Sequence, residues 1–158
     1  MDARPAAVFG CTARQGAQIT FLCPMTISQP LALAGVHHIA IICADYTASK
    51  AFYTEVLGLK IIREVHRAAR ASYKLDLAVN NQYVIELFSF PNPPPRPSRP
   101  EALGLRHLAF AVADLTEATR RLATHSVAYE PIRVDEFTDR RFTFFADPDG
   151  LPLELYEV

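Results

Sequence analysis

Four side chains that could bind a metal occupy matching places in the two halves of this sequence. They are His38, Glu86, His107 and Glu154. Gly-Val-His-His-Ile-Ala-Ile, which begins at Gly35, returns 69 positions later as Gly-Leu-Arg-His-Leu-Ala-Phe. Val-Ile-Glu-Leu-Phe around the first glutamate returns as Pro-Leu-Glu-Leu-Tyr around the second. Each half therefore carries one histidine early and one glutamate late.

The pattern of residue sizes directs these side chains to one face of their strands. Because alternate side chains of a strand point to opposite faces, His38 shares a face with Ala40, while Ile39 and Ile41 fill the other face. Each glutamate likewise stands between two aliphatic residues. We expect the bulky faces to pack on helices and the histidines and glutamates to face a cleft.

This set of donors is typical of a transition-metal site. A carboxylate inside an apolar strand is costly to desolvate unless it is paired or bound to a metal. Two imidazole nitrogens and two carboxylate oxygens suit Zn, Ni, Co, Mn or Fe, and six-coordination would leave two positions for water or substrate. An open position predicts catalysis. The alternative is four unrelated structural residues, which does not account for their repeated placement.

Other histidines are weaker candidates for ligands. His37 competes with its neighbour, but it lies on the opposite face of the strand and matches Arg106 in the second half. His66 has no counterpart in the repeat and is expected on the surface. His125 is expected to interact with the dipole at the end of a helix.

The expected elements repeat as strand, helix and three strands. In the first half the patterns predict strands over 36–42, 59–66, 72–79 and 82–90 and a helix over 46–57. In the second half they predict strands over 105–112, 127–133, 141–146 and 151–157 and a helix over 115–125. Asp45 and Asp114 are placed to cap the helices, and Asp147-Pro148-Asp149-Gly150 is a strong turn signal. Two such units could close two curved sheets around a shared cleft.

The segments outside these units are distinct in composition. Residues 1–34 have no counterpart in the second half, and we interpret them as a poorly ordered N-terminal extension. Six prolines between 91 and 100 cannot continue a sheet and predict a linker over 91–103. Module 1 then spans 35–90 and module 2 spans 104–158.

The composition limits the partners. The formal net charge is −1 and no basic run is longer than Arg140-Arg141, which argues against nucleic acid and against an anionic membrane surface. No stretch approaches the ~18 apolar residues of a membrane span. Three cysteines form no metal-like spacing, and their odd number favours a reducing, cytoplasmic location.

These motifs resemble the vicinal oxygen chelate superfamily. The resemblance covers 36–158 and rests on the two Gly-x-x-His-[Ile/Leu]-Ala motifs and on the Asp-Pro-Asp-Gly turn followed by Leu-Glu-Leu. It implies an α+β fold in which two tandem βαβββ modules form curved mixed sheets around a metal-binding cleft, at 35–158. It also implies a homodimer. Members can close the cleft within one chain or across a two-fold axis, and the sequence does not choose between these two arrangements.

Within that superfamily, two histidines and two glutamates resemble glyoxalase I, or lactoylglutathione lyase. This resemblance implies a lyase or isomerase that needs a divalent metal, acts on a small α-hydroxycarbonyl that chelates it, and uses Glu154 as the catalytic base. Extradiol dioxygenases use two histidines and one glutamate, so Glu86 favours the lyase branch. The alternatives are such a dioxygenase and a non-catalytic binding protein of the same fold.

One departure concerns the substrate. In bacterial glyoxalase I, which this sequence resembles, the matching strands carry the motifs His-x-x-x-Arg and Glu-x-x-x-Asn. The arginine and the asparagine of these motifs help to hold glutathione. Here the corresponding residues are Ile42 and Phe90. We expect an apolar wall near the metal and a substrate that is smaller or less polar at that end than glutathione.

Overall fold

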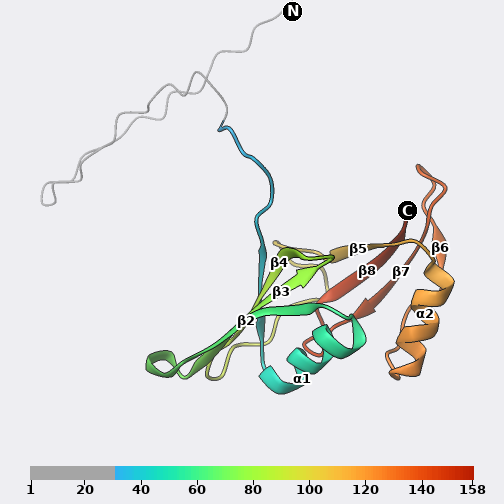
Figure 1. The fold of residues 1–158 in the computed structure, drawn as a ribbon. Coiled ribbons are helices and arrows are strands. Elements are labelled where there is room, and N and C mark those ends of the chain that lie inside the picture. The colour runs from blue at the N-terminus through green and yellow to red at the C-terminus, as the bar shows by residue number, and fades with distance from the viewer. Residues whose placement is uncertain (1–30) are drawn as a thin grey trace, which may run out of the picture. The chain divides into compact units, whose positions relative to one another are not determined.

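Two four-stranded mixed sheets, one from each half of the sequence, form the frame of the protein (Figure 1). The computed structural model describes residues 31–158, and 35–158 make up one unit. The expected N-terminal extension falls mostly on residues 1–30, which lie outside the described residues. No helix within 31–158 is both long and apolar enough to cross a membrane.

Both halves have the same order of elements and the same sheet topology. The first half contains β1 (Ile39–Cys43), α1 (Tyr46–Ala51), the π-helical turn η1 (Phe52–Val56), β2 (Lys60–Arg67), the 3-10 turn η2 (Ala68–Arg70), β3 (Ser72–Val79) and β4 (Gln82–Ser89). The second half contains β5 (Leu108–Val112), α2 (Leu115–Thr124), β6 (Arg133–Val134), β7 (Arg141–Ala146) and β8 (Pro152–Glu157). The strand orders are β1-β4-β3-β2 and β5-β8-β7-β6, with a parallel pair at β1–β4 and at β5–β8. The expected α+β fold of two βαβββ modules is confirmed.

Local sequence accounts for the ends of these elements. The side chains of Asp45 and Asp114 each accept a hydrogen bond of 3.0 Å from the backbone amide three residues later, which caps α1 and α2 as expected. Asn80 and Asn81 have φ of 47° and 66°, and asparagine tolerates this left-handed conformation in the two-residue turn between β3 and β4. Gly58, at φ +71°, follows the last helical turn of the first half.

One expected strand is wrong. The pattern predicted a strand over 127–133, whereas β6 contains only Arg133–Val134. Tyr129 forms a single bridge with Phe145, and no ladder continues from it. The physical reason is Pro131, which has no amide hydrogen to donate to a neighbouring strand.

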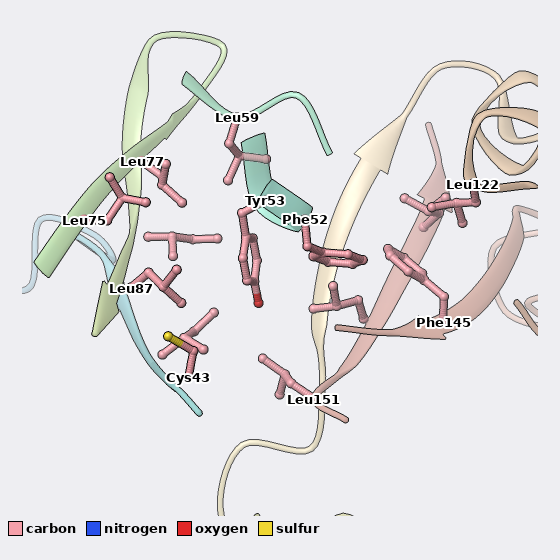
Figure 2. Packing of buried hydrophobic residues seen from close by; sticks show 14 of the residues in the cluster. Cys43, Phe52, Tyr53, Leu59, Leu75, Leu77, Leu87, Leu122, Phe145 and Leu151 are labelled. Atoms are coloured by element: carbon pink, nitrogen blue, oxygen red, sulfur yellow. The ribbon is translucent and has the colours of Figure 1, made fainter. Parts of the chain in front are cut away.

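The bulky faces of the strands pack on the helical side as expected. In β3 and β4, Leu75, Leu77, Ile85 and Leu87 are completely buried, and Tyr53 of η1 lies beside them (Figure 2). Cys43, on the same side of β1, is also buried, and this burial raises the pKa of its thiol to about 11. Burial of each large apolar side chain contributes about 1.5–3 kcal/mol to folding.

A turn from the second half docks on the first half. The Tyr53 hydroxyl donates a hydrogen bond of 2.9 Å to Asp147, and the Ala44 amide donates one of 3.1 Å to Asp149. The rings of Phe52 and Phe145 face each other at the same junction, with centroids 6.4 Å apart (Figure 2). The two modules are therefore joined by a packed and hydrogen-bonded interface.

Two β-bulges set the register of the first sheet. The turn at Asn80-Asn81 pairs Ala78 with Tyr83, but β4 then contains an extra residue at Val84, so that Asp76 pairs with Glu86. A second irregularity between Ile61 and Arg63 in β2 places Arg63 opposite Asp76. These shifts put Arg63 of β2, Asp76 of β3 and Glu86 of β4 side by side on one face of the sheet, which we call the ligand face.

Candidate metal-binding site

The four expected ligands are brought together as two pairs. His38 directly precedes β1, Glu86 lies in the parallel neighbour β4, and His38 Nε2 is 3.4 Å from Glu86 Oε2. In the second sheet His107 directly precedes β5, Glu154 lies in β8, and His107 Nε2 is 2.9 Å from Glu154 Oε2. Both sheets build their pair alike, since Ala40 and Ala109, two residues after each histidine, lie opposite the glutamates.

These separations fit two ligands of one metal ion. Nitrogen and oxygen ligands lie about 2.0–2.2 Å from zinc, so neighbouring ligands in a tetrahedral or octahedral shell are about 3–3.5 Å apart. Each pair therefore offers one imidazole nitrogen and one carboxylate oxygen at a suitable spacing. Within residues 31–158, however, no group of three or more His, Cys, Asp or Glu side chains is arranged to hold a metal.

Glu86 is held by donors that the sequence analysis did not identify. Lys74 Nζ lies 2.5 Å from Glu86 Oε1, and the Tyr83 hydroxyl also donates to this oxygen. Burial alone would raise the pKa of Glu86, but the hydrogen bonds from Lys74 and Tyr83 outweigh it and lower the pKa. One oxygen of the carboxylate is thus fixed, and the other faces His38.

Asp76 extends this network across the ligand face. It is 3% exposed, and it accepts from Lys74 Nζ at 2.6 Å and from Arg63 Nη2 at 2.6 Å. These two cations lower the pKa of Asp76 although burial opposes them. Strand alternation could have placed Lys74 with Asp76, because they are two residues apart in the predicted strand. It could not have placed them beside Glu86, because that depends on the bulge at Val84.

Glu154 has a simpler environment. It is 9% exposed, and within the described residues its carboxylate makes one polar contact, which is with His107. The His107 ring packs edge to face on Phe144, which lies opposite Glu154 in β7, with centroids 5.1 Å apart. Aromatic rings thus take the place in this sheet that Lys74 and Asp76 take in the first.

The expected position of His37 is wrong: strand alternation placed it on the face opposite His38, but its Nδ1 is 2.7 Å from His38 Nδ1 and its ring contacts Tyr83. The physical reason is that β1 begins at Ile39, so neither histidine follows the alternation of the strand. His66 is exposed and packs against Tyr73. His125 is the C-terminal cap of α2.

The surroundings of the two pairs differ in polarity. Ile42 is 55% exposed on the ligand face, as expected of an apolar wall. Phe90 is half-buried and stacks on Phe88, but the guanidinium of Arg67 lies over both rings, so this end of the face also carries a charge. A separate cavity of about 760 Å³ lies beside His107.

Comparison with known proteins shows extensive similarity. The model of the glyoxalase/bleomycin resistance protein/dioxygenase superfamily matches residues 35–155. YaeR of Escherichia coli (strain K12) is 65% identical over 127 residues, which are 80% of this chain and 98% of that protein. YwkD of Bacillus subtilis (strain 168) is 61% identical over 125 residues, which are 79% of this chain and 98% of that protein.

A solved structure has the same fold. The glyoxalase family protein from Enterococcus faecalis is 48% identical, with a TM-score of 0.74, and the match covers 80% of this chain and all of that chain. The match to the family model spans both histidine–glutamate pairs and both βαβββ modules. The chain belongs to the glyoxalase/bleomycin resistance protein/dioxygenase superfamily, which is also called the vicinal oxygen chelate superfamily.

Proposed function

We propose that the protein is a divalent-metal-dependent lyase or isomerase of the glyoxalase I type, acting on a small α-hydroxycarbonyl compound. The observation that carries this proposal is the repeated pair of an imidazole nitrogen and a carboxylate oxygen, 3.4 Å apart in one sheet and 2.9 Å apart in the other. Two such pairs supply the two nitrogen and two oxygen ligands that the metals named above accept.

The proposed site is shared between two copies of the chain. One pair alone supplies only two ligands, and no larger ligand group exists within 31–158. A two-fold axis that places the ligand face of the first sheet against the second sheet of the partner would join His38 and Glu86 to His107 and Glu154 of the partner subunit. A homodimer would then contain two equivalent sites.

Glu154 is the better candidate for the catalytic base. Glu86 is held by Lys74 and Tyr83, which lower its pKa and make it a poor acceptor of a proton. The carboxylate of Glu154 has His107 as its polar contact in the described chain, so it is freer to move toward a substrate. A bound divalent metal would supply Lewis acidity that stabilises negative charge on the substrate oxygens. Glu154 would take the proton from the carbon beside the carbonyl and return it to the neighbouring carbon.

Metal content is the first test. Chains carrying His38→Ala, Glu86→Ala, His107→Ala or Glu154→Ala should each lose most of the Ni, Co, Mn or Zn that the wild-type chain binds at about one ion per chain. His66→Ala is the matched control and should keep full metal content. Elemental analysis after dialysis measures both, and wild-type stoichiometry in both the His38 and His107 variants would refute the site.

Proton exchange tests the chemistry. The metal-loaded protein in D₂O should exchange the carbon-bound hydrogen of a small α-hydroxycarbonyl, measured by proton NMR. Glu154→Gln should slow the exchange per bound metal by about 10²–10⁴-fold, the usual contribution of a general base. An equal loss in Glu86→Gln would contradict the choice of base. Oxygen uptake with an iron-loaded protein would instead indicate a dioxygenase.

A further inference from the structure

Three cations lie across the ligand face of the first sheet, and two of them are neutralised. Arg63 contacts Asp76 at 2.6 Å, and Lys74 contacts both Asp76 and Glu86. Arg67 follows on the same face of β2, because it is four residues beyond Arg63 and pairs with Ser72. It has no carboxylate within 4.0 Å among the residues that the structure describes.

The Arg67 guanidinium is nevertheless firmly positioned. Its carbon Cζ lies 4.9 Å from the centre of the Phe88 ring and 5.5 Å from that of Phe90. Its Nε donates a hydrogen bond of 3.1 Å to the hydroxyl of the fully buried Ser72. Its Nη2 is buried and has no hydrogen-bond partner within residues 31–158. A buried donor without a partner is rare and calls for a missing acceptor.

The second sheet contains a similarly stacked arginine that has a counter-ion within the chain. Arg133 of β6 lies over Phe142 and Phe144 at 5.0 and 5.3 Å, an arrangement closely similar to that of Arg67. Its Nη2 lies 2.8 Å from Glu130 Oε2, so its charge is balanced within the chain. Both arginines are therefore stacked on two aromatic rings, but of the two only Arg67 lacks a counter-ion within the described residues.

We infer that Arg67 is a specificity-determining residue that binds a terminal oxyanion, a carboxylate or a phosphate, of the substrate. The inference rests on the proposed function for the position of the other end of the substrate. Along β4, Phe88 is about 7 Å and Phe90 about 13 Å beyond Glu86. The substrate would thus carry its metal-chelating oxygens and its anionic group about 7–10 Å apart. A guanidinium suits both candidate anions because it keeps its positive charge and donates charge-assisted hydrogen bonds to their oxygens.

The first experiment uses the metal-free protein, so that it does not depend on the proposed catalytic site. Inorganic phosphate and acetate are titrated into ¹⁵N-labelled protein, and the Arg67 Nε–H resonance is followed by NMR. A saturable shift of this resonance is expected, and the stronger of the two responses identifies the class of anion. Arg133 supplies an internal control, because its signal should not move. The absence of a saturable shift at Arg67 with both anions would overturn the inference.

The second experiment compares two ligands of the metal-loaded protein by calorimetry. 2-Hydroxyadipate ends in a carboxylate, whereas 2-hydroxyhexanoate ends in a methyl group at nearly the same length. The first should bind about ten- to a hundredfold more tightly, the value of a hydrogen bond to a charged group. Arg67→Gln should abolish this preference, and Arg70→Gln, an exposed arginine three residues away, should preserve it.

The two experiments separate the two proposals. If Arg67 responds to anions in the metal-free protein while the four ligand variants keep their metal, the inference stands and the proposed catalytic site fails. If the variants lose their metal but Arg67→Gln leaves the preference for 2-hydroxyadipate unchanged, the inference fails alone. The thermal unfolding midpoint of Arg67→Gln is measured as a control. A midpoint equal to that of the wild type would show that a lost preference is not due to unfolding.

Discussion

Tyr53 donates a hydrogen bond of 2.9 Å to Asp147, and both side chains are buried at the junction of the two modules. Burial is the largest influence on Asp147 and raises the pKa of its carboxyl group. Tyr53→Phe should lower the free energy of unfolding by about 1–3 kcal/mol, because Asp147 would lose a donor that water cannot replace. Urea unfolding measures the change. Tyr73→Phe alters an exposed tyrosine and should have almost no effect; equal losses in both would contradict this role.

The hydroxyl of Tyr83 should affect metal binding without being a ligand. It donates to Glu86 and to Asp76, so it orients the carboxylate whose other oxygen faces His38. Removing a group that orients a ligand typically weakens metal affinity by 10–100-fold. Competition with a chelating dye should show a loss of about this size in Tyr83→Phe. Tyr73→Phe again serves as the control, and unchanged affinity in the Tyr83 variant would remove this tyrosine from the site.

Acid should selectively weaken the contact between β8 and the start of α2. Hydrogen bonds from Arg141 and from the Leu115 amide lower the pKa of Glu157 from 4.5 to about 2. Since the pKa is lower in the folded chain, this stabilisation is present above pH 4.5 and is lost as the pH falls toward about 2. The thermal unfolding midpoint of Glu157→Gln should therefore be below that of the wild type at pH 7. The difference between the two midpoints should shrink as the pH falls from 4.5 toward about 2. Thermal unfolding at several pH values tests this; Glu136→Gln should show no such convergence.

Mixing two inactive variants should restore metal binding if the site is shared. In a heterodimer of His38→Ala and Glu154→Ala chains, both defects fall in one site, and the other site is intact. Random exchange should recover about a quarter of the sites, measured as bound metal after co-refolding. His38→Ala mixed with Glu86→Ala should recover none, because each site keeps one defect. Equal results for the two mixtures would place each site within a single chain.

The hemithioacetal of methylglyoxal and glutathione should be a poor substrate. Ile42 stands exposed where the resemblance to glyoxalase I leads us to expect an arginine, and an apolar side chain cannot pair a charged end of glutathione. We expect kcat/KM below about 10⁴ M⁻¹s⁻¹ with the Ni, Co, Mn and Zn forms, and an increase in Ile42→Arg. A steady-state assay decides, and a wild-type value near ~10⁷ M⁻¹s⁻¹ would show that the departure is harmless.

The fold and the nearness of each histidine to its glutamate could be predicted from the repeat, but the surroundings of Glu86 could not. A two-residue turn at Asn80-Asn81 alone would pair Glu86 with Leu75 on the helical side. The extra residue at Val84 shifts the pairing to Asp76 and brings Tyr83 to the same face as Glu86. Nothing in the residues around Val84 marks a bulge, because its energy depends on the packing of the whole sheet.

The lack of a counter-ion at Arg67 could not be predicted from the sequence either, because it also depends on how the strands pair. Arg67 and Lys74 are equally plausible cations in the sequence, and only side-chain positions show that Lys74 is paired with two carboxylates. The failed strand over 127–133 has a simpler cause, since Pro131 was present in the segment and should have shortened it.

The contacts of the Asp147–Gly150 turn mean that the duplicated halves are no longer independent folding units. An isolated first half would expose Phe52 and leave the Ala44 amide and the Tyr53 hydroxyl without their acceptors. Neither half is expected to fold when it is expressed alone, and the whole of 35–158 should unfold in one cooperative transition. The two similar halves should therefore unfold as one unit, so that a destabilising substitution in either half lowers the stability of the whole of 35–158.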